Sequence, residues 1–112
     1  VDGGMGDNIR PALYDAKYDA LIANKAADDP TEIVTIAGKY CESGDVLVRD
    51  ILVPPPVYGD SLVVPASGAY NLAMSSDYNL NGRPAVVLVE DGNAQLIRRR
   101  ETYEDMMRAD VV

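Results

Sequence analysis

The sequence lacks histidine entirely and contains a single cysteine, Cys41. Without an imidazole, the chain has no Ser–His or Cys–His nucleophile pair and no zinc site that requires a histidine ligand. One cysteine cannot form an internal disulfide, which favours a reducing compartment and predicts a cytoplasmic protein. A GxGxxG phosphate loop and a Walker lysine are also missing from the Gly-rich opening. Hydrolytic triads are therefore excluded.

Basic residues are scarce: Lys and Arg number 10 against 18 acidic residues, which gives a formal charge of −8. A protein that binds nucleic acid needs a basic face for the phosphates, so no nucleic-acid partner is expected. The one basic run, residues 98–100, is followed by Glu101 and is interpreted as a solvated strand end. No apolar run approaches the length needed to span a membrane, so no membrane partner is expected either.

What is present predicts one mainly β domain over residues 1–112. The length suits a single core and is too short for a barrel enzyme of about 250 residues. Short apolar segments with turn residues between them are typical of a Greek-key β-barrel or sandwich with short helices. The predicted strands are residues 20–24, 33–37, 46–48, 51–53, 62–64, 85–90 and 94–99.

Three short helices are expected between and after these strands. Residues 9–14 contain a proline near the start of a helical stub. Residues after Ser67, as far as 76, are rich in helix formers, with Ser67 as the cap. Residues 102–108 have Thr102 as a cap and Asp105 at the third helical position. The hairpin signal Asp-Gly-Asn at 91–93 separates the last two strands.

The run Cys41-Glu42-Ser43-Gly44-Asp45 comes shortly after the end of the predicted strand 33–37. A thiol beside a carboxylate can donate a proton next to an anionic clamp, and loops at strand ends usually display such groups. The alternative is that Cys41 is a small buried apolar residue. Glu42 and Asp45 could also act as paired carboxylates, but without histidine or a third acid no metal site is expected.

Two further sites carry candidate binding groups. Arg10 and Tyr14 are four residues apart, so a helical turn places a guanidinium and a phenol on one face, where they fit a carboxylate or phosphate. The alternative is an arginine packed on a tyrosine ring at the surface. Tyr70 lies at a predicted helix start, where backbone N–H groups attract anions, and the alternative is a core tyrosine. Tyr78 and Tyr103 are interpreted as structural.

Taken together, several separated motifs resemble the diaminopimelate decarboxylase family. They are residues 1–5, 8–14, 38–45, 68–70, 78–79 and 99–105, in the family's order. The family belongs to the fold type III pyridoxal-phosphate enzymes, which join an N-terminal (β/α)8 barrel to a C-terminal β-domain. The resemblance implies that this chain is that C-terminal β-domain, with residues 1–15 leading in from the barrel.

The resemblance also implies roles for five residues. Cys41 would donate the proton that replaces carbon dioxide, and Glu42 would hold the ammonium at the unreacted end of the substrate. Arg10 and Tyr14 would bind the carboxylate at that same end, and Tyr70 would contact the cofactor phosphate and border the substrate. The implied reaction converts meso-diaminopimelate to L-lysine and CO2 in lysine biosynthesis, with a homodimer completing the active site.

The chain departs from the family in what it lacks. The Schiff-base lysine and the phosphate loop for pyridoxal 5'-phosphate belong to the barrel, and Lys17, Lys25 and Lys39 lie in no motif that matches that lysine. The start at Val1 without an initiator methionine suggests a fragment, which alone is expected to be inactive. Gly6 and Tyr40 also differ from the residues common in the family. The alternatives are a non-catalytic binding module and a sister ornithine or arginine decarboxylase domain.

Overall fold

The computed structural model describes residues 1–111 of the chain. In chain order its elements are α1 (Arg10–Tyr14), β1 (Leu21–Ile22), the 3-10 turn η1 (Ala23–Lys25), β2 (Glu32–Ala37), β3 (Val46–Val53), β4 (Leu62–Val63), α2 (Gly68–Met74), the 3-10 turn η2 (Tyr78–Leu80), β5 (Val86–Glu90), β6 (Asn93–Arg98) and α3 (Tyr103–Met107). The expected β domain with short helices is confirmed. None of the described helices has the length and apolar character that crossing a membrane requires.

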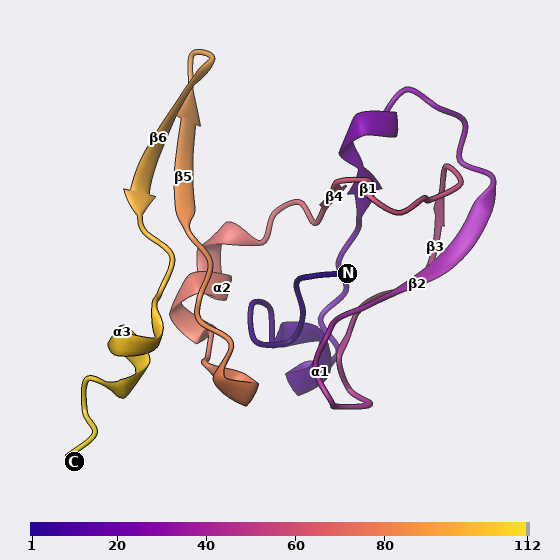
Figure 1. The fold of residues 1–112 in the computed structure, drawn as a ribbon. Coiled ribbons are helices and arrows are strands. Elements are labelled where there is room, and N and C mark those ends of the chain that lie inside the picture. The colour runs from indigo at the N-terminus through magenta and orange to yellow at the C-terminus, as the bar shows by residue number, and fades with distance from the viewer. Residues whose placement is uncertain (112) are drawn as a thin grey trace.

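The strands form three antiparallel pairs, β1 with β4, β2 with β3, and β5 with β6 (Figure 1). Turn spacing along the sequence predicted a Greek-key barrel or sandwich, in which such pairs join into larger sheets. Within residues 1–111 the ladders stay separate, because each strand has a hydrogen-bonded neighbour on one side only. Within these residues the antiparallel pairs are observed, but the larger sheets that would join them into a Greek key are not.

Strand β3 is longer than the sequence indicated. Residues 46–48 and 51–53 were predicted as two pieces divided by Arg49 and Asp50, but they form one strand. Asp50 adopts a left-handed φ of 52°, and the register with β2 shifts between Val34 and Ile36. A bulge of this kind bends a ladder without ending it. The polar pair therefore lies inside the strand.

The core lies where β2 and β3 meet the segment that leads into β1. Its buried cluster consists of Ala20, Ile36, Leu47 and Val48. The half-buried residues Tyr18, Val34, Ile51, Leu62 and Val64 pack against that cluster. Burying such apolar side chains contributes roughly 25 cal/mol per Å² removed from water. The buried apolar cluster therefore lies in the N-terminal half of the chain.

The β5–β6 hairpin stands apart from this core in Figure 1. Its turn is the one that the sequence indicated: Asp91 and Gly92 have φ of 49° and 76°, as in the primed turns that suit strand twist. Every residue of β6 is exposed. The large apolar side chains exposed on this hairpin are Val87, Leu88, Val89, Leu96 and Ile97. Exposed apolar side chains gathered in this way are typical of a surface that contacts another protein segment.

The helix signals were right about position and only partly right about capping. Thr102 and Asp105 form a capping box at the start of α3, as predicted. Ser67 occupies the cap position of α2, but its hydroxyl donates to Val64 O at 3.0 Å and does not cap the helix. The predicted cap is therefore wrong, because a neighbouring carbonyl holds the serine hydroxyl.

Asp60 ties the turn after β3 to η1. Its carboxylate accepts hydrogen bonds from Lys25 Nζ at 2.7 Å, from Asn24 Nδ2 at 2.8 Å and from Val57 N at 2.8 Å. These donors, with the Lys25 side chain first, lower the pKa of Asp60 from 3.8 to about 2. The carboxylate is therefore bound in its charged form in the folded chain.

This network predicts an acid-sensitive contribution to stability. The depressed pKa means that the contribution is complete above the unfolded pKa of 3.8 and is lost as the pH falls through about 2. Asp60→Asn is therefore expected to lower the urea midpoint at about pH 6, and the difference from wild type should shrink toward about pH 2. The control is Asp29→Asn, at an exposed aspartate. If the urea midpoints of wild type and Asp60→Asn differed by the same amount throughout this pH range, the assignment would be contradicted.

Candidate functional site

Arg10 opens α1 and makes both of its side-chain hydrogen bonds with phenols. Its Nε donates to Tyr14 Oη at 2.5 Å, and its Nη1 donates to Tyr18 Oη at 2.6 Å. Tyr14 is four residues along the same helix, which is the spacing that places two side chains on one face. The Tyr14 bond is the largest cause of the raised pKa of Arg10, so the guanidinium is charged at all ordinary pH values.

Tyr70 joins this group from α2, far along the chain. The Arg10 Cζ lies 4.8 Å from the centre of the Tyr70 ring, and 5.6 Å from the centre of the Tyr14 ring. Tyr70 is 57% exposed, so the alternative of a core tyrosine is wrong. The surface stacking of arginine on tyrosine is also real, since ring contacts accompany the hydroxyl bonds. The structure thus brings three predicted site residues together.

Cys41 and Glu42 lie on the loop between β2 and β3. Cys41 is a free, exposed thiol, which rules out the alternative of a buried apolar residue. Glu42 is also exposed, and its Oε1 accepts a hydrogen bond from Gly44 N at 3.1 Å. No hydrogen bond to Glu42 Oε2 occurs within residues 1–111. The loop therefore displays a thiol beside a carboxylate with free acceptor capacity.

Asp45 does not pair with Glu42. Only 3% of Asp45 is exposed, and its carboxylate accepts hydrogen bonds from Met5 N at 2.6 Å and from Tyr40 N at 2.8 Å. The hypothesis of paired carboxylates is therefore wrong. Asp45 is buried and has a structural role, whereas Glu42 is exposed to solvent. By bonding both segments, Asp45 fastens the loop that carries Cys41 to the Gly-rich segment that leads into α1.

Tyr40 completes this attachment, and its part was not visible in the sequence. Its ring is buried and lies 5.6 Å from that of Tyr78, centre to centre. Burial is the main cause of the raised pKa of Tyr40, followed by the charges of Asp7 and Asp45. A Cβ on Gly6 would overlap the Tyr40 hydroxyl. In this chain the buried Tyr40 ring therefore requires a residue without a side chain at position 6.

The site residues fall into two groups within this chain. Arg10 contacts both Tyr14 and Tyr70, whereas Cys41 and Glu42 occupy a separate loop. Among the described residues, no hydrogen bond, ion pair or ring contact links the two groups. A single copy of this chain therefore presents two partial sites.

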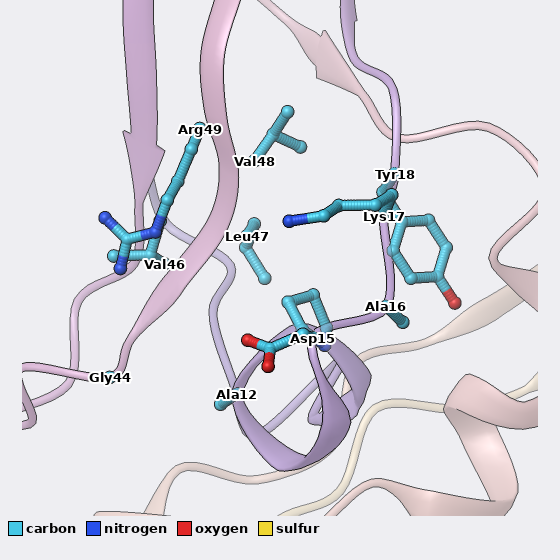
Figure 2. A pocket seen from close by; sticks show the side chains of 11 residues that line it. Ala12, Asp15, Ala16, Lys17, Tyr18, Gly44, Val46, Leu47, Val48 and Arg49 are labelled. Carbon is cyan, nitrogen blue, oxygen red and sulfur yellow. The ribbon is translucent and has the colours of Figure 1, made fainter.

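A cavity of about 240 Å³ lies between the segment after α1 and β3, and its lining includes none of the five predicted site residues. Figure 2 shows Lys17 reaching into it toward Leu47 and Val48, while the Tyr18 hydroxyl points away from that lysine. A separate cavity of about 230 Å³ is lined by Arg10, Tyr18, Pro65 and Ala66, among others. The second cavity is the one that adjoins the predicted binding group.

Comparison with known proteins decides the family. Residues 1–68 match the model of the family described as pyridoxal-dependent decarboxylase, C-terminal sheet domain. The chain belongs to this family. Within the decarboxylase domain, the match includes Arg10, Tyr14, Cys41 and Glu42, and it ends two residues before Tyr70.

Curated relatives of this decarboxylase domain share its whole length. Diaminopimelate decarboxylase from Synechocystis is 56% identical over 98% of the chain and 24% of the relative. The Bacillus subtilis enzyme of the same name is 54% identical over 99% of the chain and 25% of the relative. The crystal structure of diaminopimelate decarboxylase from M. jannaschii in complex with L-lysine has a TM-score of 0.87 and 40% identity, over 99% of the chain and 25% of that structure.

The decarboxylase domain thus spans about a quarter of the length of the relatives that it matches. Its residues fit the edge of a pyridoxal-phosphate site better than the centre. Tyr70 is exposed and its ring lies beside a charged guanidinium, and this combination of groups suits a phosphate. Lys25, in contrast, donates to Asp60 and to Pro55 O, so its ammonium is already engaged.

Proposed function

We propose that this chain is the C-terminal domain of a diaminopimelate decarboxylase, which converts meso-diaminopimelate to L-lysine and CO2. The observation that carries the proposal is 56% and 54% identity to curated enzymes of that name over nearly the whole chain. The geometry supports it, because Tyr14, Tyr70, Cys41 and Glu42 are exposed and the half-buried Arg10 keeps guanidinium N–H groups without a partner in the described chain. The rest of the longer protein supplies the barrel and the lysine that binds the cofactor.

Arg10 and Tyr14 bind the distal carboxylate of the substrate. Two of the five guanidinium N–H groups are used by Tyr14 and Tyr18, which leaves enough donors for a two-point contact with a carboxylate. Because the pKa of Arg10 is raised, this contact persists across the working pH range. A substrate with no distal carboxylate would leave the guanidinium without its partner.

Glu42 and Cys41 act on the substrate from the other loop. The exposed Glu42 carboxylate holds the distal ammonium, using the oxygen that its own loop leaves free. Pyridoxal phosphate, held in part by Tyr70, supplies the electron sink that makes loss of CO2 possible. As the bond to the carboxylate breaks, the Sγ of Cys41 delivers its proton to the same carbon and then regains a proton from solvent.

Two copies of the chain complete each site. One copy presents the Arg10 group and the Cys41 loop without any contact between them in the described part of the chain. A homodimer in which the Cys41 loop of one copy faces the Arg10 group of the other unites all five residues. This arrangement agrees with the exposure of Tyr14 and Tyr70 in one group and of Cys41 and Glu42 in the other.

The longer protein is expected to release CO2 from meso-diaminopimelate when pyridoxal phosphate is added. Its kcat/KM for ornithine and arginine should be lower by about a thousandfold, because neither places a carboxylate opposite Arg10. Comparable turnover of ornithine would instead identify a sister decarboxylase. Absence of turnover with all three amino acids would favour a non-catalytic module.

A further inference from the structure

Tyr18 is the third phenol at Arg10, and no motif in the sequence drew attention to it. Its hydroxyl accepts the hydrogen bond from Arg10 Nη1 at 2.6 Å, across eight residues of chain. The same ring lies 5.6 Å from the Arg10 Cζ. Tyr18 also lines the cavity of about 230 Å³ that Arg10 adjoins. It thus belongs to the binding group by geometry.

The three tyrosines around Arg10 differ in how they are held. Tyr14 and Tyr70 are 50% and 57% exposed, so solvent or substrate can reach them. Tyr18 is half-buried and packs against the core cluster of β2 and β3. A side chain packed in a core keeps one rotamer, whereas exposed side chains change theirs. Tyr18 is therefore the partner whose position the fold determines.

The hydrogen bonds to Tyr14 and Tyr18 fix the orientation of the Arg10 guanidinium. Nε is used by Tyr14 and one N–H of Nη1 by Tyr18, while Nη2 has no hydrogen bond within residues 1–111. A guanidinium held at two of its nitrogens cannot rotate freely, so the third nitrogen points in one direction. Such preorganisation raises affinity because less freedom is lost when the ligand binds.

We propose that Tyr18 is a positioning residue that orients Arg10 toward the distal carboxylate of the substrate. The assignment rests on the proposed function, because it concerns the same binding group. Tyr18 acts through the guanidinium and does not touch the reacting carbon. Its effect is therefore on recognition of the carboxylate and not on the proton transfer.

The test is Tyr18→Phe in the longer protein with pyridoxal phosphate bound. The variant keeps the ring in the core and removes only the hydroxyl. KM for diaminopimelate should rise about tenfold while kcat stays nearly constant, which is the scale of one hydrogen bond to a charged group. Inhibition by L-lysine, which has no distal carboxylate, should be unchanged. The matched control is Tyr58→Phe, at a fully exposed tyrosine, which should change none of these values.

The outcomes separate this inference from the proposed function. If the wild-type protein decarboxylates diaminopimelate and Tyr18→Phe has the same KM, Tyr18 has no positioning role and the proposed function stands. If KM for diaminopimelate and the inhibition constant for L-lysine rise together with a lower melting temperature, the role is only structural and the inference is overturned. If the wild-type protein has no activity on diaminopimelate, both proposals fail.

Discussion

Replacing Cys41 by alanine in the longer protein is expected to lower kcat by about 10²–10⁴-fold and to leave KM for diaminopimelate nearly unchanged. The exposed thiol is the proposed proton donor, and its removal takes away a group used in the chemical step. Binding of the distal end depends on Arg10, Tyr14 and Glu42, which this variant retains. The measurement is steady-state CO2 release over a range of diaminopimelate concentrations.

The control for Cys41→Ala lies two residues away on the same loop. Ser43 is exposed, and its hydroxyl makes only a 3.4 Å bond to Glu42, so Ser43→Ala should keep nearly full turnover. Unchanged kcat in Cys41→Ala would remove the thiol from the mechanism. An equal loss in both variants would show that disturbance of the loop, and not loss of the thiol, lowers the rate.

The same variant tests how the site is assembled. Cys41→Ala and Arg10→Ala each damage a different partial site, so each pure dimer should be nearly inactive. A dimer with one copy of each has one intact site if the two groups meet across the interface. Mixed and re-equilibrated variants should then recover about a quarter of wild-type turnover. No recovery would place both groups in the site of a single copy.

Asp45→Ala is expected to have the largest effect on stability, about 3 kcal/mol in the free energy of unfolding. The substitution removes the acceptor for Met5 N and for Tyr40 N, and these donors lie where water is largely excluded. Gly4 and Gly38 pack so tightly on this carboxylate that a Cβ on either would overlap it. Chemical denaturation of the longer protein, followed by a probe in this domain, measures the change.

Two controls sharpen the Asp45 prediction. Asp45→Asn keeps the volume but turns an amide N–H₂ toward one of the backbone donors, so most of the destabilisation should remain. Asp29→Ala, at an exposed aspartate, should alter stability by less than about 0.5 kcal/mol. If Asp45→Ala lowered the free energy of unfolding no more than Asp29→Ala does, Asp45 would not hold the Cys41 loop to the segment before α1.

Much of the candidate site was predictable from the sequence because its signals are local. The four-residue spacing of Arg10 and Tyr14 was enough to place both on one face of α1. The thiol next to a Ser-Gly turn after an apolar strand indicated a displayed loop, and Cys41 is exposed. The contributions of Tyr18 and Tyr40 were not predictable, because Tyr18 meets Arg10 from beyond the end of α1 and Tyr40 packs on Gly6, which is far away in the chain.

The local sequence determined the hairpin turn at Asp91 and Gly92 and the capping box of α3, since neighbouring residues supply the interactions involved. Tertiary structure decided which acid is buried and which is displayed, because the burial of Asp45 depends on backbone donors from Met5 and Tyr40. It also decided that Arg10 and Cys41 occupy separate surfaces. The contact between Met5 and Asp45 forms only when segments distant in the chain pack together, so no short window of sequence contains both partners.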